Sequence, residues 1–399
     1  MKNLFFAVFL VLITLKGLAQ VNNSVTNSNS VPVEEKESAP PVAPSNDVEE
    51  IQIQEVKALK KSEVKSSSAK KSEESMGKSK ADMTTDLMRS EQNAFLKSNE
   101  EARVQRTQRN PSRMRQETMD DAVTYFEKNA PESFEYHYFK YLSGNYDTKL
   151  RDHLLQAEKL RPENSDVHLQ LTALYEIEGQ EVLKKEYLSK LANNGRIQKS
   201  MIDYASDVLL SCQDGDFLVT HALEDAAAIW YQQSVGNIKG EVKIVSLDLL
   251  QSETYREHLR TLGLDIPESD LIDTQFLKNF LVRNTSKSID LSMTLPKEYF
   301  TDIANQLYVK GLTFVYSENG SVNVDNVHLW NNTLGKHLVE ESTDDKGRQL
   351  SSNYLPMLIV IREAYVKNNE QDKRKEIDKV IQHLVIQSKK QYNYSKIEE

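Results

Sequence analysis

The sequence predicts an α/β domain combined with an α-solenoid, in which helix hairpins pack on a small, mostly parallel sheet. Three observations support this fold class. Residues 131–195 show repeat-like spacing, residues 213–330 alternate short apolar strands with helices, and residues 354–387 hold another pair of helical segments. Strands that alternate with helices are typical of a parallel sheet, because each helix carries the chain back across the sheet.

Two degenerate tetratricopeptide-like hairpins are expected between residues 131 and 195. This repeat has a period of about 34 residues, with aromatic and small residues at fixed positions. Matching residues occur in both units: Tyr141, Ala157 and Pro162 in the first, and Leu171, Tyr175 and Gly179 in the second. The eighth position departs from the pattern, since it holds Tyr138 and Thr172 rather than a small residue. Two units bury little surface alone, so we expect them to pack on neighbouring helices.

The middle of the chain predicts the sheet and its helices. Strand-like patterns occur at 217–220, 242–247, 289–295 and 312–316. Helical patterns occur between and around them, at 200–212, 224–235, 253–262, 269–282 and 299–309, and again at 354–368 and 371–387. The alternation of apolar and polar residues over 289–295 indicates a half-buried strand. We expect Cys212 and Trp230 to be buried in the core.

Residues 1–20 are typical of a secretory signal peptide. An apolar run over 4–15 is followed by small residues at Gly17 and Ala19, so we expect cleavage after Ala19 or Gln20. The run is too short to span a bilayer comfortably, and a membrane anchor is the alternative. Later stretches fall short of the roughly 18 apolar residues of a membrane helix. We therefore expect a periplasmic or secreted protein that does not span the membrane after cleavage.

Residues 21–116 are expected to form a disordered tether with a weakly helical, basic end. The first part is rich in Pro, Ser, Lys and Glu, which bury too little apolar surface to offset chain entropy. Five arginines near the end form a basic patch: Arg103, Arg106, Arg109, Arg113 and Arg115. This patch is either a contact with a membrane or polyanion or, as we favour, a solvated helix face that compensates an acidic body. The predicted domains that follow are repeats over 117–212, the α/β domain over 213–330 and carboxyl-terminal helices with a repeat-like hairpin over 331–399.

Charge and motif content exclude several classes of function. A net charge of −10 argues against nucleic-acid binding, which requires a basic face. A single cysteine excludes an internal disulfide. The eight histidines are scattered without the spacing of metal ligands, and no P-loop, nucleophile elbow or dinucleotide motif occurs. We therefore expect a protein that is not an enzyme, with no catalytic, cofactor-binding or metal-binding residues.

One turn is a candidate ligand site, because it joins the predicted strand 217–220 to the following helix. Ligands of α/β sheets usually bind at such a strand end, facing a helix N-terminus. The polar residues that could line this site are Thr220, His221, Glu224, Asp225 and Ser246. The turn lacks the glycines of a phosphate-binding loop, and an acidic pair suits a helix start that needs no ligand. We therefore favour a structural role and keep a degenerate ligand pocket as the alternative.

Three blocks of the sequence resemble a known family. FLVTHALEDAAAIWYQQSVGNIKGEVKIVSLDLLQSETY and SIDLSMTLPKEYFTDIANQLYVKGLTFVY, followed by the helices from Tyr354, are similar to the region after the membrane domain in large Bacteroidota membrane proteins. Those proteins are described as protein O-mannosyltransferase-like, or by a domain of unknown function. The resemblance covers about residues 196–390. The residues that carry it are Thr220, Asp225, Trp230, Tyr231, Gln233, Ser246, Leu247, Leu249, Leu250, Tyr255, Gly311, Leu312 and Tyr316.

The departures from the family pattern limit what the resemblance implies. The family's Asn-Gly-Asp-Asn is replaced at 221–224, and Ala226 and Ala228 stand in place of its Thr and Pro. The membrane-embedded half, where glycosyl transfer would occur, has no counterpart here. The resemblance implies the fold and a Gram-negative envelope setting, and it argues against transferase activity.

We therefore expect a non-enzymatic cell-envelope scaffold or protein-interaction module that uses its helical repeats. Its partners would be other envelope proteins or peptides, because helical repeats present extended binding surfaces. The alternative is a glycan-binding or glycosylation-accessory protein with a degenerate pocket at the turn Thr220 to Asp225.

Overall fold

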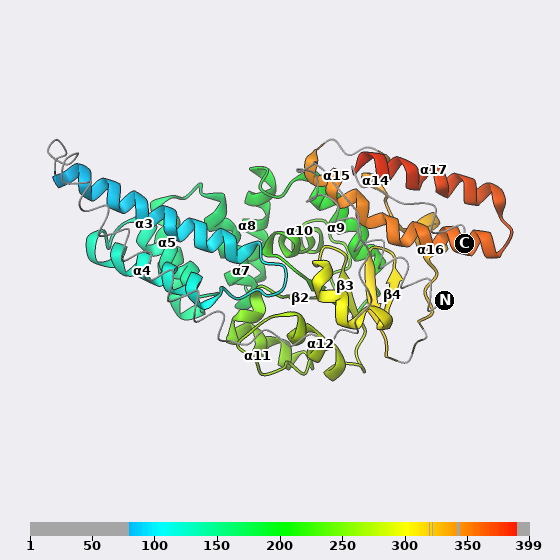
Figure 1. Cartoon of the computed structure of the whole chain (residues 1–399), viewed down its shortest axis with the longest axis horizontal. Helices are drawn as coiled ribbons and strands as arrows, with labels where there is room; N and C mark the ends of the chain where they lie inside the picture. Colours follow the sequence, from blue (N-terminus) through cyan, green and yellow to red (C-terminus); the bar gives the residue numbers. More distant parts are fainter. Residues whose placement is uncertain (1–79, 319, 321, 341–343, 389–399) are drawn as a thin grey trace, which may run out of the picture. The chain divides into compact units, whose positions relative to one another are not determined.

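The computed structural model describes residues 80–318, 320, 322–340 and 344–388. The predicted signal peptide at 1–20 and residues 21–79 of the predicted tether lie outside the described residues. The chain divides into two compact units, and one of them contains everything from Glu91 onward. This unit is mainly helical and holds one five-stranded sheet (Figure 1). None of the helices in the described ranges has both the length and the hydropathy needed to cross a bilayer.

Residues 91–116, which we expected to form the weakly helical, basic end of a disordered tether, are helical in large part and packed on the rest of the fold. Helix α3 spans Lys80–Arg103 and helix α4 spans Arg113–Asn129. The ring of Phe95 is fully buried and stacks on Phe139, with 3.9 Å between ring centroids. Local periodicity did not indicate this packing, because α3 has few apolar residues and its partners lie far along the chain. The folded body therefore begins well before residue 117.

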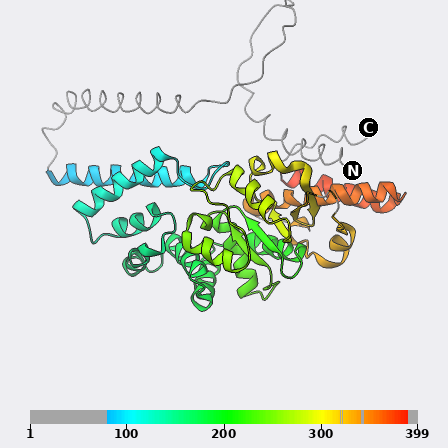
Figure 2. The same ribbon diagram turned by 90° about the horizontal axis from the view of Figure 1, so that it is seen from below.

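The helix hairpins expected between residues 131 and 195 are present. Helices α5 (Phe134–Ser143) and α6 (Arg151–Leu160) form the first, and α7 (Ser165–Ile177) and α8 (Glu181–Asn193) form the second. Polar caps set where the first helix of each pair starts, since the side chains of Ser133 and Asn164 accept hydrogen bonds from backbone N–H groups of the first turn. Figure 2 shows α4 to α8, in cyan to green, following one another toward the sheet.

The second hairpin is part of the main core rather than a separate layer. Helix α7 contacts α10 (Leu223–Ser234) and α11 (Glu253–Thr261), and α8 also contacts α10. Its residues Ala173, Leu188 and Leu191 are fully buried in the same hydrophobic cluster as the strands. The expectation that the repeats lean on neighbouring elements is confirmed for this hairpin.

The sheet is mixed, in contrast to the mostly parallel sheet that we predicted. Its strands are β1 (Phe217–Thr220), β2 (Lys243–Ser246), β3 (Ile289–Ser292), β4 (Leu307–Lys310) and β5 (Thr313–Tyr316), in the order β2-β1-β3-β5-β4. Strand β1 pairs in parallel with β2 and β3. Strand β5 pairs antiparallel with β3 and with β4. The predicted parallel pairing is therefore correct for β1, β2 and β3, and wrong for the pairs that β5 makes with β3 and β4.

The error arises at β4, which we included in a helix over 299–309. The helical part is a 3-10 segment, Lys297–Gln306, and the chain then turns into a β-hairpin. Gly311 makes that hairpin possible, because its φ is +56° and a Cβ there would lie 2.2 Å from the Ser211 hydroxyl. The Ser211 hydroxyl in turn accepts a hydrogen bond from the Leu312 N–H at 2.9 Å.

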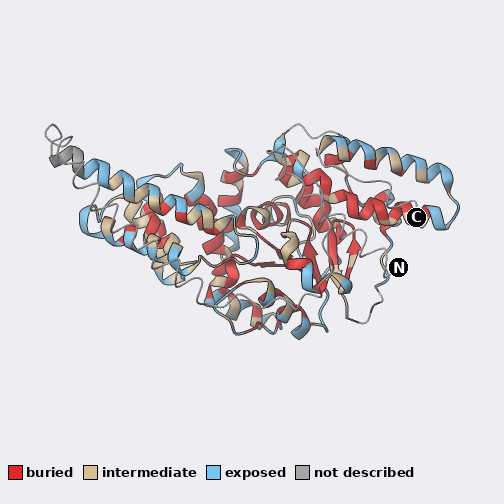
Figure 3. Ribbon diagram, viewed as in Figure 1, coloured by how far each residue is buried: buried red, intermediate tan, exposed pale blue. Residues whose placement is uncertain are grey.

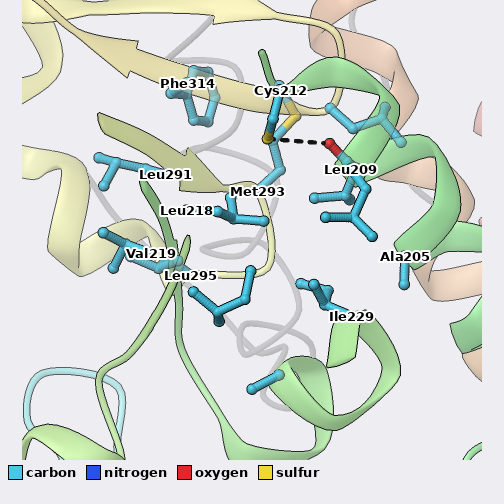
Figure 4. Close-up of a cluster of buried hydrophobic side chains, with 14 of the residues drawn as sticks. Ala205, Leu209, Cys212, Leu218, Val219, Ile229, Leu291, Met293, Leu295 and Phe314 are labelled. Carbon is cyan, nitrogen blue, oxygen red and sulfur yellow. Dashed lines mark hydrogen bonds between the residues drawn. The ribbon is translucent and has the colours of Figure 1, made fainter. Parts of the chain in front are cut away.

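The hydrophobic core lies between the sheet and the helices that cover it (Figure 3). Cys212 and Trp230 are 3 % and 1 % exposed, as predicted. Figure 4 shows Cys212 among Leu209, Leu218 and Phe314, with its thiol donating to the Val208 carbonyl at 3.4 Å. Helix α9 (Lys199–Ser211) and helix α12 (Thr274–Arg283) complete the cover. Helix α12 starts later than predicted because Asp273 caps it, accepting from the Phe276 N–H at 2.8 Å.

The carboxyl-terminal helices include the predicted hairpin, formed by α16 (Leu355–Lys367) and α17 (Gln371–Gln387). Short elements precede it: α13 (Asn326–His328), a π-helix (Leu329–Thr333), α14 (His337–Glu340), α15 (Asp345–Ser351) and a 3-10 turn (Ser352–Tyr354). The buried Asp207 on α9 anchors this region. Its carboxylate accepts from the N–H groups of Gly335 and Lys336 at 2.6 and 2.8 Å, and from the Tyr354 hydroxyl.

A buried ionic triad joins the segment before β1 to β3 and β4. The Lys310 ammonium lies 2.8 Å from carboxylate oxygens of both Asp216 and Asp290, and all three side chains are at most 9 % exposed. Burial raises the pKa of Asp290 to about 7, although Lys310 opposes the shift. Burial also acts to raise the pKa of Asp216, but hydrogen bonds with Asp290 and Lys310 hold it below its ordinary value. Asp290 is therefore the carboxyl group that holds a proton near neutral pH.

We expect Asp290→Asn to remove part of the pH dependence of stability. A carboxyl group in the unfolded chain loses its proton near about pH 4, whereas folded Asp290 keeps it up to about pH 7. The native state binds more protons between these values, so the free energy of unfolding falls as pH rises through this window. Urea unfolding at several pH values in this window should show that the free energy of unfolding falls less steeply with pH in the variant than in the wild type.

Asp372→Asn is the matched control, because the Asp372 side chain is 96 % exposed on α17. It should keep the slope of the wild type. Equal slopes in the wild type and in Asp290→Asn would contradict the assignment of this proton.

Candidate functional site

The two strand ends of the predicted ligand turn lie side by side. Thr220 ends β1 and Ser246 ends β2, and the two residues are partners in the parallel register. Both are fully buried, and neither hydroxyl makes a hydrogen bond within the described part of the chain. A backbone hydrogen bond also joins the two strand ends, since the Leu247 N–H donates to the Thr220 carbonyl at 3.0 Å.

The turn after β1 is occupied by an arginine from the amino-terminal part of the chain. Arg109 is 4 % exposed, and its Nη1 lies 3.0 Å from His221 Nε2. Its Nε donates to Asp248 Oδ1 at 2.6 Å. The other Asp248 oxygen accepts from the Leu223 N–H, which begins α10, at 2.8 Å. The position where a ligand of an α/β sheet usually lies is thus filled by Arg109 and Asp248.

Two more guanidinium N–H groups of Arg109 donate to backbone carbonyls. Its Nη1 donates to the Gln105 carbonyl and its Nη2 to the Arg103 carbonyl, both at 3.1 Å. A buried arginine is tolerated only when its charge is paired and its N–H groups are bonded. The charge of Arg109 is paired and four of its five N–H groups are bonded, so it acts as a fixed structural group.

His221 is held neutral by its surroundings. Burial, followed by the charges of Arg109 and Arg106, lowers the pKa of His221 to about 3. The neutral imidazole accepts a hydrogen bond from Arg109 at Nε2, and its ring makes an edge contact with Tyr299, with 5.7 Å between centroids. Because Nε2 is engaged and the ring resists protonation, His221 is unsuited to proton transfer near neutral pH.

A short segment delivers Arg109 to this position. We call residues 104–112 the strap. Its backbone pairs with the loop before α12, since the Arg109 N–H donates to the Ile272 carbonyl at 2.9 Å and the Thr274 N–H donates to the Thr107 carbonyl at 3.1 Å. The Ile272 N–H also donates to the Asn110 side chain at 2.6 Å. The strap is therefore bound by main-chain contacts as well as by charge.

The basic patch of the sequence is an ion-pair interface with the α/β part. Arg103 pairs with Glu224, and Arg106 binds Glu298 through two hydrogen bonds of 2.9 Å. Arg113 and Arg115 pair with Glu117 and Glu101 nearby. The favoured interpretation, a solvated face that compensates acidic charge, describes the exposed Arg113. It does not describe Arg109, which is buried.

The two acidic residues of the turn occupy the first turn of α10, as predicted, but they face different surroundings. Glu224 also contacts Arg196, at 3.2 Å, in addition to Arg103. Asp225 lines a small cavity of about 10 Å³ with Tyr204 and Ser292. Burial raises the pKa of Asp225. The structure therefore joins His221 and Glu224 through the arginines, while Asp225 lies apart from them.

Arg109 and Asp248 were missed as members of this site. Asp248 follows β2 at the same sheet edge that His221 occupies after β1, and this position was a usable signal. The regular spacing of Arg103, Arg106 and Arg109 was a second signal, but it does not reveal which acids they meet. In the described ranges, no three His, Cys, Asp or Glu side chains are grouped so that they could hold a metal ion.

Residues 201–397 match the family model of TMEM260-associated domain 2. Neither the curated proteins nor the solved structures gave a match to this chain. The matched region begins in α9 and includes His221 and Asp248, whereas Arg109 lies outside it. A segment outside the matched region therefore completes the carboxyl edge of β1 and β2. The carboxyl-terminal part of this chain is related to a domain that is associated with TMEM260.

We expect Arg109→Met to destabilise the fold by about 3–5 kcal/mol, because it leaves the buried Asp248 without a counter-charge. Arg106→Met is the matched control on the same strap, and its side chain is 42 % exposed. The control should cost less than about 1 kcal/mol, as exposed ion pairs do. Chemical denaturation of both variants checks this. Equal losses would contradict a special role for the buried pair.

Thr220→Val should stabilise the protein by about 1 kcal/mol, since it replaces an unpaired buried hydroxyl with a methyl group of similar shape. Thermal unfolding at neutral pH provides the measurement. The exposed Thr301→Val serves as control and should change stability little. A clear loss of stability in Thr220→Val would mean that the hydroxyl has a partner in solution.

Proposed function

We propose that this protein is an exported, non-enzymatic scaffold of the Gram-negative cell envelope, periplasmic or secreted, that binds other envelope proteins or peptides. The observation that carries the proposal is the filled strand end. Arg109, Asp248 and His221 occupy the place where an α/β sheet usually holds a substrate, and they satisfy one another. The chain itself therefore fills the position that a substrate would occupy at this edge of the sheet.

The helix hairpins support a role in protein interaction. We interpret α5 to α8 as degenerate tetratricopeptide-like repeats, because the marker residues Tyr141 and Ala157 are 1 % and 0 % exposed at the helix contacts. The second helix of each hairpin exposes one large apolar side chain, with Leu160 of α6 at 42 % and Val182 of α8 at 83 %. Exposed apolar side chains on repeat helices are suited to a partner surface.

The family relation supports the envelope setting. The matched domain and the three blocks that resemble Bacteroidota O-mannosyltransferase-like membrane proteins cover nearly the same residues. The alternative, a glycan-binding or glycosylation-accessory protein, needs an open pocket at the turn Thr220 to Asp225. Such a pocket would require Arg109 to leave its buried ion pair, so the scaffold is the better supported function.

We expect Val182→Glu to weaken partner capture from an envelope extract, because it replaces the exposed apolar side chain of α8 with a charged one. The matched control is Ile386→Glu on α17, since Ile386 is similarly exposed at 78 %. Both variants should keep the stability of the wild type, as exposed substitutions do. Crosslinking followed by mass spectrometry identifies the captured proteins.

A partner set that Val182→Glu loses and Ile386→Glu retains would support binding through the hairpins. A set lost in both variants, or in neither, would place the binding surface elsewhere. Specific retention of soluble glycans by the full chain, with no protein partner, would favour the alternative function.

A further inference from the structure

A polar cavity lies where the strap meets α3, α5 and α7. It has a volume of about 40 Å³, and its lining includes Arg103, Arg109, Tyr141, Asp248 and Gln251. A cavity needs about 10–15 Å³ of such volume for each water molecule, so this one has room for about three. That space also suits a small molecule of four or five non-hydrogen atoms.

Two polar atoms around this cavity have no partner. The hydroxyl of Tyr141, a residue 1 % exposed, makes no hydrogen bond within the described chain, and neither does Gln251 Oε1. The amide of Gln251 is fixed in this orientation, because its Nε2 donates to the Asp248 carbonyl at 3.1 Å. Buried polar atoms without partners are rare, so a donor and an acceptor on a bound molecule are expected here.

The cavity offers guanidinium N–H groups to an anion. Two guanidinium groups, Arg103 and Arg109, line it together with the carboxylate of Asp248, and Glu224 pairs with Arg103 beside it. Arg109 uses four of its five N–H groups on protein partners, whereas within the described residues the side chain of Arg103 donates only through Nη2, to Glu224. The Nε and Nη1 groups of Arg103 can therefore bind an oxyanion, for which a guanidinium group has matching geometry.

The loop that closes the cavity has an unusual backbone. Asn145 and Tyr146 follow one another with φ of +49° and +67°, a conformation that non-glycine residues seldom adopt, and both line the cavity. Asn145 is held by Gln116, to which its Nδ2 donates at 3.0 Å. Strained backbone of this kind is concentrated at ligand sites.

We propose that this cavity binds a small oxyanion that also carries a hydroxyl group, as hydrogen phosphate and 2-hydroxycarboxylates do. The anionic oxygens bind Arg103 and the Tyr141 hydroxyl, and the ligand hydroxyl donates to Gln251 Oε1. The proposal does not depend on the scaffold function, because the cavity is separate from the outer faces of α6 and α8.

The test measures binding of inorganic phosphate, glycolate and acetate to the full chain by calorimetry, at constant ionic strength set with chloride. We expect saturable binding of phosphate or glycolate. The anion that binds more tightly shows whether the ligand is a phosphate or a 2-hydroxycarboxylate. Acetate lacks the hydroxyl group and should bind more weakly. Equal affinities for acetate and glycolate would overturn the assignment of Gln251 to the ligand hydroxyl.

Tyr141→Phe should weaken binding about tenfold, as loss of a hydrogen bond to a charged group does, without lowering the stability of the unliganded protein. Tyr138→Phe is the matched control on the same helix, because Tyr138 does not line the cavity. Gln251→Glu gives an independent variant that repels the anion and should abolish binding. The proposal would be overturned if neither phosphate nor glycolate bound. It would also be overturned if Tyr141→Phe and Tyr138→Phe lost the same amount of affinity.

Discussion

The buried ion pair between Arg109 and Asp248 joins three parts of the fold. The Asp248 carboxylate receives Arg109 from the strap on one oxygen and the first N–H of α10 on the other, just after the end of β2. Neither charge is tolerable alone in this environment, because an unpaired buried ion loses its hydration without compensation. The packing of the strap, and with it the junction between the helix hairpins and the sheet, therefore depends on this contact. The more exposed ion pairs of Arg103 and Arg106 also hold this part of the chain against the α/β part, but they contribute less to stability.

This contact changes the role of the strand ends β1 and β2. In an open α/β sheet the carboxyl edge is the usual ligand position, and the polar residues Thr220, His221 and Ser246 lie there. Arg109 converts that edge into an internal interface, and His221 becomes a neutral hydrogen-bond acceptor. The Thr220 and Ser246 hydroxyls stay unpaired at this edge within the described residues, and two further unpaired polar atoms, on Tyr141 and Gln251, lie at the neighbouring cavity. The ligand site that we propose therefore lies at the junction of the strap and the hairpins, and the turn itself is closed by Arg109.

Buried charge recurs in the sheet. Lys310 bridges Asp216 and Asp290, so the segment before β1, the central β3 and the edge strand β4 share one ionic cluster. Such clusters add little net stability compared with apolar packing, but the loss of one member leaves the others unpaired. The two clusters connect elements that are distant in sequence, and both limit how the elements can be arranged around the mixed sheet.

The sequence by itself determined the features that depend on local periodicity. Helices α5 to α10, strands β1 to β3, the acidic start of α10 and the burial of Cys212 and Trp230 follow from residue spacing and side-chain type. Only the tertiary structure decided the folding of the strap, the antiparallel β4 and β5 pair and the closure of the candidate turn. Arg109 and Asp248 are separated by 139 positions, and the charge pattern at either end fits many possible partners. The choice among them depends on burial, which lowers the effective dielectric and makes one pairing obligatory, and burial exists only once the chain has folded.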